Sequence, residues 1–299
     1  MSTDPMPIYH SISIPDSLDN LRTVLHTAPE NTRILAGGTD ILLELKQDIE
    51  PSIDLMVDVT SIPELQRFEE NEDQLFIGAA VPLSTIAASP VVGKYALALQ
   101  EACRLIGGPQ VRNVATLGGN VAHALPAADG SISLLSLDAS AQIMETSGKI
   151  TVRKLSDLYL GPGKTALLPK EVIIGFLVKK TNPGQGSAFK RIMRPQGVAL
   201  PILNIAIWAE RTGLTIHSIR IAVGPGGPIP TRCIETESFL SGKRPEEAII
   251  DEAAEILLRN IKLRTSAQRA SASYRKHLCV QLFKDVLLEA WNRSGQMNS

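Results

Sequence analysis

The chain has few of the residues that mark several common classes of protein. Only 4% of its 299 residues are aromatic, and the formal net charge is −1 with no basic block. We therefore predict no binding to nucleic acid or to an anionic membrane surface. No apolar run reaches the roughly 18 residues that a membrane-spanning helix needs. The N-terminal segment has no charged-then-apolar signal pattern, so we expect a cytoplasmic protein.

Cysteine is also scarce. Cys103, Cys233 and Cys279 lie far apart, without a C-x-x-C spacing or a Cys/His cluster. This pattern supports neither a zinc site nor an iron–sulfur cluster, and we interpret the three as small buried side chains. The chain is 44% hydrophobic and 20% charged, which is typical of a globular protein, and its length indicates about two domains.

Glycine pairs occur at two places where the chain turns. In Ile34-Leu-Ala-Gly-Gly-Thr-Asp-Ile41, a short apolar run ends in Gly37 and Gly38 and leads into a helical pattern. Backbone amides at such a turn can approach an anion closely, and Thr39 adds a hydroxyl donor. The plainer interpretation is an ordinary connection from strand to helix, with Asp40 as the helix cap.

A second pair, in Thr116-Leu-Gly-Gly-Asn120, changes the balance between these interpretations. Two glycine turns that face each other could hold the pyrophosphate of a dinucleotide from both sides. Neither turn carries Lys or Arg, so we expect backbone dipoles to hold the anion. The sequence has no G-x-G-x-x-G motif opening a βαβ unit, so it does not support a Rossmann site. It has no G-x-x-x-x-G-K-[ST] motif either, which excludes a P-loop.

Strands and helices mix along the chain without an internal repeat. Strands are expected at 7–14, 32–36, 53–59, 74–79, 139–145, 149–153, 171–178, 186–193, 202–210 and 215–223. Helices are expected at 17–27, 41–46, 92–106, 131–137, 231–240, 245–260 and 267–292, with a short one starting at Pro82. A change in composition at 160–180 is a candidate domain boundary.

Several motifs together resemble one protein family. Ala36-Gly-Gly-Thr-Asp40, Thr116-Leu-Gly-Gly-Asn120, Pro126-Ala-Ala-Asp129 and Ser187-Ala-Phe-Lys190 occur in the order and spacing of the FAD-binding subunits of molybdenum hydroxylases. That family includes the flavoproteins of xanthine dehydrogenase and carbon monoxide dehydrogenase. The segment Ala272-Ser-Tyr-Arg275 is similar to the start of its last helix, so the resemblance extends from about residue 6 to 292.

The resemblance implies an α+β fold of the PCMH type. It implies an FAD-binding domain at 1–177, with subdomains at about 1–58 and 59–177, and a C-terminal domain of antiparallel sheet and helices at 178–299. It also implies a set of FAD contacts, held without a covalent bond. These are Ile34, Leu35, Ala36, Gly37, Gly38, Thr39, Asp40, Ile41, Thr116, Leu117, Gly118, Gly119, Asn120, Asp129, Ile173 and Lys190.

Some of these assignments have alternatives. Ile174 could replace Ile173, because the alignment there needs a short gap. Asp129 could be a helix cap, and Lys190 a solvated lysine on a strand. We interpret His123 as a partly buried histidine with satisfied hydrogen bonds, not a catalytic one.

By the same resemblance, the chain passes electrons and leaves substrate hydroxylation to other subunits. Electrons would come from [2Fe–2S] clusters on a small subunit, after substrate reacts at a molybdenum–pterin cofactor on a large subunit. They would leave through FAD to NAD⁺, a quinone or another acceptor, in a complex expected to be a dimer of heterotrimers. The alternatives are a self-contained flavin oxidase and a nucleotide-binding scaffold subunit without a redox role.

Overall fold

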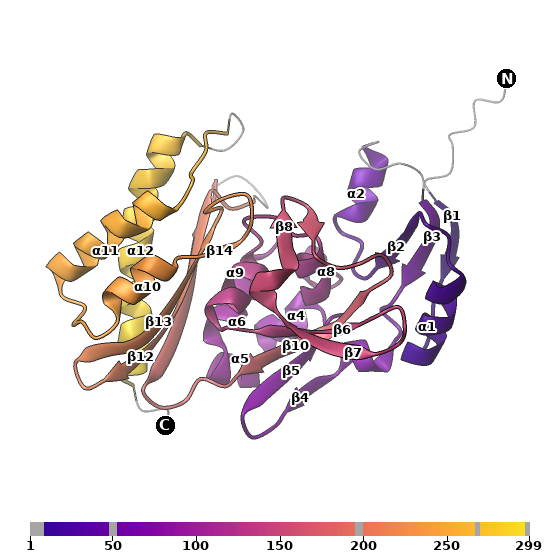
Figure 1. The fold of residues 1–299 in the computed structure, drawn as a ribbon, viewed down its shortest axis with the longest axis horizontal. Coiled ribbons are helices and arrows are strands. Elements are labelled where there is room, and N and C mark those ends of the chain that lie inside the picture. Colours follow the sequence, from indigo (N-terminus) through magenta and orange to yellow (C-terminus); the bar gives the residue numbers. More distant parts are fainter. Residues whose placement is uncertain (1–8, 48–52, 195–199, 267–269, 297–299) are drawn as a thin grey trace.

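The computed structural model describes residues 9–47, 53–194, 200–266 and 270–296. Within these ranges the chain forms sheets of three, five and four strands and a small β8–β9 pair. The three larger sheets follow one another along the length of the molecule, with helices between them (Figure 1). Among the described helices, none combines the length and apolar character that crossing a bilayer requires.

The first sheet is parallel, with strand order β1-β3-β2. Its elements are β1 (Tyr9–Ser13), α1 (Leu18–Thr27), β2 (Thr32–Leu35), α2 (Ile41–Lys46) and β3 (Ile53–Asp58). The Oγ of Ser17 accepts a hydrogen bond from the Asn20 amide and caps α1. Residues 7 and 8 of the first predicted strand lie outside the described residues. Because β2 ends at Leu35, the first glycine turn begins at an edge of this sheet.

The second sheet is antiparallel, with strand order β4-β5-β10-β6-β7. Its strands are β4 (Phe68–Glu70), β5 (Gln74–Gly78), β6 (Ser140–Met144), β7 (Ile150–Lys154) and β10 (Val172–Lys179). Its helices are α3 (Pro63–Gln66), α4 (Leu83–Ala88), α5 (Pro90–Tyr95), α6 (Leu97–Leu105), α7 (Pro109–Arg112), α8 (Leu117–Ala122) and α9 (Asp129–Ser136). A 3₁₀ turn (Leu155–Leu158), β8 (Tyr159–Gly161) and β9 (Lys164–Thr165) complete this part.

Two local predictions in this part were wrong. The single helix predicted at 92–106 is two helices, because the chain leaves helical geometry at Ala96, where φ is −147°. The second glycine pair is not a turn: Gly118 and Gly119 lie in the first turn of α8, after the N-cap Thr116. Apolar spacing and glycine content do not reveal such local breaks and caps.

The third sheet is antiparallel, with strand order β11-β12-β13-β14. Its elements are β11 (Gln185–Ile192), β12 (Leu203–Thr212), β13 (Thr215–Gly224), β14 (Thr231–Arg232), α10 (Ile234–Leu240), α11 (Glu247–Asn260) and α12 (Ala272–Ser294). Helices α10 to α12 cover its outer face, while α6 and α9 pack on the inner face toward the second sheet (Figure 1). The C-terminal antiparallel sheet with helices is as predicted, but residues 231 and 232, predicted to begin a helix, form β14. The last helix begins at Ala272, and residues 267–269 of its predicted range lie outside the described residues.

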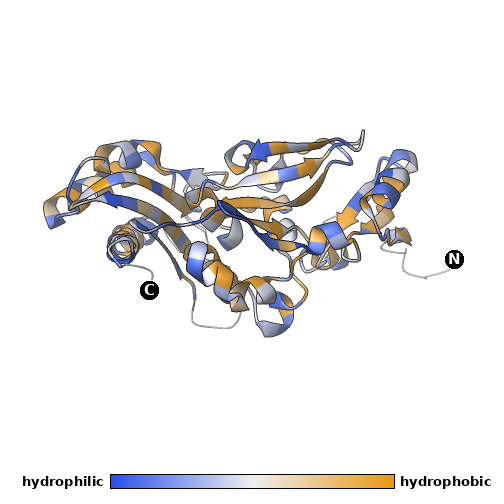
Figure 2. Ribbon diagram, turned by 90° about the horizontal axis from the view of Figure 1, so that it is seen from below, coloured by the Kyte–Doolittle hydropathy of each residue, from blue (hydrophilic) through white to orange (hydrophobic). Residues whose placement is uncertain are grey.

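Strand β11 connects two hydrophobic cores because its side chains alternate between faces. Phe189 belongs to the core shared with the second sheet, whereas Ala188 belongs to the core beneath α10 to α12. Figure 2 shows polar and apolar residues interspersed along the ribbons of the sheets. The next two residues, Lys190 and Arg191, therefore point to opposite sides of the sheet.

Candidate cofactor-binding cleft

A cleft of about 760 Å³ lies where the first glycine turn, α8, α9 and the C-terminal domain meet. Its volume falls within the roughly 300–1,000 Å³ of typical small-molecule sites. Eleven of the predicted contact residues line it: Ile34, Ala36, Gly37, Gly38, Thr39, Asp40, Ile41, Thr116, Gly119, Asn120 and Asp129. The fold therefore brings together the two glycine motifs and Asp129, as the sequence predicted.

The remaining predicted contacts lie outside this lining: Leu35, Leu117, Gly118, Ile173, Ile174 and Lys190. Leu35, Leu117 and both isoleucines are buried in hydrophobic cores. Gly118 packs on Ala79, and a Cβ at Gly118 would stand 2.7 Å from the Ala79 Cβ. Cofactor contact by these residues stays a prediction. The visible role of all but Lys190 is packing, and Lys190 forms an ion pair with Glu289.

The first glycine turn presents backbone donors to the cleft. Within the described residues, the amides of Gly37 through Ile41 donate to no other group. Gly38 has a φ of +69°, which favours glycine. A Cβ at Gly37 would lie 2.2 Å from the carbonyl oxygen of Val114. Gly37 therefore lets the chain before α8 approach the turn, and the unbonded amides form a concave set of donors for an anion.

The second motif works differently from its predicted role. The amide of Gly118 donates to Ala79 O at 2.9 Å, and the amide of Asn120 donates to Thr116 O at 3.0 Å. The amide of Gly119 donates to Thr116 Oγ1 at 3.1 Å. Because all three amides are already bonded, this wall cannot offer them to a phosphate. It offers the Thr116 hydroxyl, the Asn120 side chain and the open face of Gly119.

Asp129 forms a buried ion pair that joins the two domains. Its carboxylate accepts from Arg191 Nη1 at 2.5 Å and from Asn204 Nδ2 at 2.5 Å. Both side chains of the ion pair are at least 95% buried. Burial raises the pKa of the Asp129 carboxyl, while Arg191 and Asn204 lower it in part. The helix-cap alternative is not observed, because Ala128 is the N-cap of α9.

Lys190 points away from the cleft. Its Nζ lies 2.7 Å from Glu289 Oε2 on α12, beside the ion pair of Arg293 and Glu101. Burial raises the pKa of Glu289, but the hydrogen bond from Lys190 and the charge of Arg293 outweigh it and hold that pKa below its ordinary value. The neighbouring Arg191 is the β11 side chain that lines the cleft.

His123 meets two carboxylates at the rim of the cleft. Its Nε2 lies 3.6 Å from Glu44 Oε1 and 4.0 Å from Asp40 Oδ1. Neither carboxylate is near His123 in the sequence, and the fold brings them there by placing α2 near the end of α8. Asp40 is the N-cap residue of α2, as the plainer interpretation predicted, but its side chain makes no cap hydrogen bond.

Sequence reasoning missed the basic residues of the cleft. Four arginines line it: Arg33, Arg191, Arg264 and Arg275. Three of them come from the C-terminal domain, and Arg275 has one of the largest fully buried side chains among the described residues. Arg191 directly follows the predicted Lys190, so the period-two alternation of a strand was the signal that could have found it.

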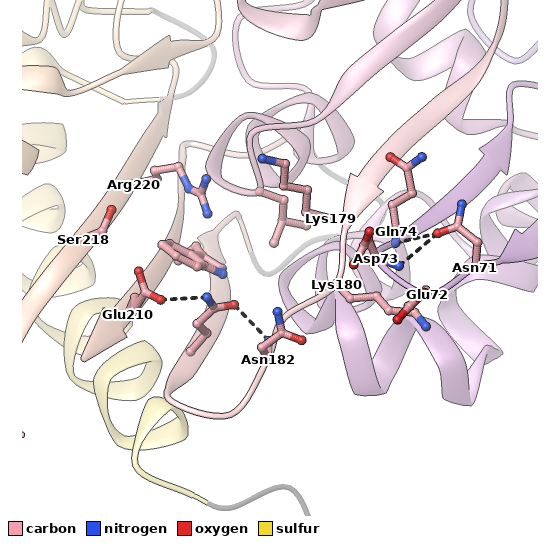
Figure 3. Close-up of a pocket in the computed structure, with 13 residues that line it drawn as sticks. Asn71, Glu72, Asp73, Gln74, Lys179, Lys180, Asn182, Glu210, Ser218 and Arg220 are labelled. Atoms are coloured by element: carbon pink, nitrogen blue, oxygen red, sulfur yellow. Dashed lines mark hydrogen bonds between the residues drawn. The ribbon is translucent and has the colours of Figure 1, made fainter. Parts of the chain in front are cut away.

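A second concavity of about 840 Å³ lies between the β4–β5 hairpin and the C-terminal sheet (Figure 3). Some of its side chains form hydrogen bonds within the lining. Gln185 bridges Glu210 and Asn182, and Asn71 closes its own turn onto Gln74. Both signs of charge face it, and it lacks a set of unbonded backbone amides like that at Gly37 to Ile41. The cleft at the glycine motifs is the better candidate for a cofactor.

The donors of that cleft suit an anionic cofactor held between the two domains. Residues 8–178 match the FAD binding domain in molybdopterin dehydrogenase, and residues 187–290 match the CO dehydrogenase flavoprotein C-terminal domain. The chain belongs to the family of FAD-binding medium subunits of molybdenum hydroxylases. It is thus a flavoprotein subunit of a multi-subunit oxidoreductase, and the predictions of FAD as cofactor and of the fold class are confirmed.

Relatives match over nearly the whole chain. The nicotine 6-hydroxylase medium subunit of Paenarthrobacter nicotinovorans is 30% identical over 94% of this chain and 96% of its own length. The carbon monoxide dehydrogenase medium chain of Hydrogenophaga pseudoflava is 28% identical over 95% and 97%. A solved structure of carbon monoxide dehydrogenase from that organism superposes with a TM-score of 0.91 at 26% identity, covering 97% of this chain and 99% of its own.

Proposed function

We propose that this chain is the electron-transfer subunit of a molybdenum-containing hydroxylase or dehydrogenase. FAD, bound without a covalent bond, would accept electrons from partner [2Fe–2S] clusters and deliver them to an external acceptor such as NAD⁺ or a quinone. A large subunit would carry the molybdenum–pterin cofactor and the substrate pocket. The observation that carries the proposal is the set of unbonded amides at Gly37 to Ile41 in a cleft shared by both domains.

The residues present fit FAD. The amides of the first glycine turn provide donors for a pyrophosphate, and Thr39 lies at the same edge. Gly119 has open space on its cleft side, since a Cβ there would meet only Thr116 Oγ1, at 3.3 Å. Asn120 Oδ1 and Arg191 Nε are buried atoms with no partner among the described residues. Such orphaned atoms are expected where a polar ligand completes the hydrogen bonding.

The cysteines support a division of work between subunits. The chain has three, and all are buried, one beneath the second sheet and two in the C-terminal core. A [2Fe–2S] cluster is normally held by four cysteine thiolates. The clusters that feed electrons to FAD therefore belong on a partner chain, and the expected assembly is a dimer of heterotrimers.

Titration with FAD tests the cofactor assignment. The purified chain should be yellow, and denaturation should release intact FAD into the supernatant. Flavin retained on the unfolded chain would contradict the non-covalent proposal, and a colourless chain that takes up no FAD would contradict the whole assignment.

Redox and purification experiments separate the proposed role from its alternatives. Photoreduced FAD on the chain should pass electrons to an acceptor dye, which a scaffold subunit would not do. Purification of the native complex should yield molybdenum and iron in partner subunits. A chain that purifies alone and oxidises a substrate by itself would indicate a self-contained oxidase instead.

A further inference from the structure

Arg191 and its partners form a polar group with incomplete hydrogen bonding at the cleft. Arg191 Nη1 donates to Asp129, but Arg191 Nη2 reaches only the thioether sulfur of Met193, at 3.1 Å, which is a weak acceptor. Arg191 Nε has no partner among the described residues. A guanidinium that is 95% buried and lines a cleft with two poorly satisfied N–H groups indicates an acceptor supplied by a ligand.

An orphaned acceptor lies on the same wall. Asn120 Oδ1 is buried without a partner among the described residues. It lies against the first turn of α9, where a Cβ at Gly130 would be 2.6 Å away. Asp129, the neighbour of Gly130, is the residue that holds Arg191. Asn120 and Arg191 both line the cleft, and both lie next to the first turn of α9, Asn120 at Gly130 and Arg191 at Asp129.

The two ends of the cleft differ in burial and in charge. At the α2 end, Asp40 and Glu44 are partly exposed and acidic. At the Arg191 end, Ala127, Ala128 and Asp129 are buried between the domains. The isoalloxazine ring of FAD has more apolar surface than adenine, so burial favours placing it at this end. Its pyrimidine edge carries an N–H between two carbonyl oxygens, which complements an orphaned acceptor beside orphaned donors.

We propose that Arg191, positioned by Asp129 and Asn204, is the cationic contact of the flavin half of FAD. This inference rests on the proposed FAD-binding function. A flavin gains negative charge on reduction, and a fixed positive group beside it favours the reduced form. Lys190, one residue earlier on the opposite face of β11, has no part in this contact.

Potentiometric titration of the FAD-loaded full chain tests the assignment. The Arg191→Gln variant should still bind FAD. Its preference for reduced over oxidised FAD should be at least tenfold smaller than that of the wild type. For a two-electron couple this is a midpoint potential lower by about 30 mV. Asp129→Asn removes the opposing negative charge and should shift the potential in the other direction. Arg191→Lys, which keeps the charge, should restore most of the wild-type potential.

Competition with ADP separates the two halves of the cofactor. ADP contains the pyrophosphate and adenosine but no flavin, so Arg191→Gln should leave its affinity unchanged. A loss of ADP affinity equal to the loss of FAD affinity would move Arg191 to the nucleotide half and overturn the proposal. An unchanged midpoint potential in Arg191→Gln and in Asp129→Asn would also overturn it, while bound FAD in these variants would leave the proposed function intact.

Asp129→Asn also covers the case in which Arg191→Gln does not fold, because it keeps the shape of the buried pair. If only this variant folds, a higher midpoint potential supports the proposal and an unchanged one refutes it. Lys190→Gln is the matched control on the same strand. It removes a charge from the face toward α12 and should leave the potential unchanged.

Discussion

Gly119 gives the sharpest test of the cleft, because stability and cofactor binding should change in opposite directions. Gly119 lies in the first turn of α8 and lines the cleft. Alanine favours a helix over glycine by about 0.5–1 kcal/mol. The single close contact of its Cβ, 3.3 Å to Thr116 Oγ1, removes part of this gain. Gly119→Ala should therefore fold at least as stably as the wild type.

The same methyl group enters the space where FAD approaches α8. If it displaces the cofactor from one charge-assisted hydrogen bond, the cost is about 1.5–3 kcal/mol. That cost corresponds to roughly a 10- to 150-fold higher Kd. Gly119→Val adds two more methyl groups and should weaken binding further. Fluorescence titration with FAD gives the Kd, and thermal melting without FAD gives the stability.

Two other glycines make the comparison informative. Gly37→Ala should lower the melting temperature, because its Cβ would overlap the Val114 carbonyl oxygen at 2.2 Å. Any weaker binding of FAD by Gly37→Ala would then result from displacement of the first glycine turn. Gly227→Ala is the neutral control, since a Cβ there meets only Thr231 Oγ1, at 3.6 Å, away from the cleft lining. Wild-type FAD affinity in both Gly119→Ala and Gly119→Val would refute the position of the cofactor along α8.

Three further outcomes follow from the surroundings of the cleft. Lys190→Met should lower the free energy of unfolding by about 0.2–1 kcal/mol, as for a half-exposed ion pair. It should leave the Kd for FAD unchanged, and a tenfold higher Kd would show that Lys190 contacts the cofactor. Burial raises the pKa of Glu289, but Lys190 and Arg293 bring it below 4.5, so this carboxylate stabilises the fold fully above pH 4.5 and loses that effect as the pH falls further. Urea unfolding should show the stability gap between wild type and Glu289→Gln shrinking below pH 4.5, and a constant gap would disprove the link. Burial raises the pKa of Cys279 to about 12, so a thiol reagent at pH 8 should label none of the three buried cysteines before unfolding; rapid labelling of the native chain would contradict their burial.

Local patterns predicted most of the secondary structure, because each depends on neighbours in sequence. The alternating strands of the C-terminal sheet and the apolar face of α12 appear where the sequence indicated them. The Gly37–Gly38 turn also lies where a strand meets a helix. These features need only the period of a strand, the period of a helix and the chemistry of glycine.

Features that depend on distant partners were not predictable in this way. Asp129 and Arg191 form their ion pair although they lie 62 positions apart in the sequence. His123 meets Glu44 because the fold brings α2 near the C-terminal end of α8. The hydrogen bond from the Gly118 amide to Ala79 O depends on where β5 ends. A sequence motif names residues that gather at a site, but the fold decides which of their atoms remain unbonded.

That distinction changes the meaning of the paired glycines. Each motif has one glycine whose missing side chain allows close packing: Gly37 against Val114 and Gly118 against Ala79. The partner glycines differ, since Gly38 supplies a positive φ and Gly119 supplies open space in the cleft. In the second motif the amides of Gly118, Gly119 and Asn120 are already bonded, so positive charge on that side of the cleft must come from side chains. The C-terminal domain provides three of the four arginines in the lining, and a tightly held cofactor therefore requires both domains of the chain.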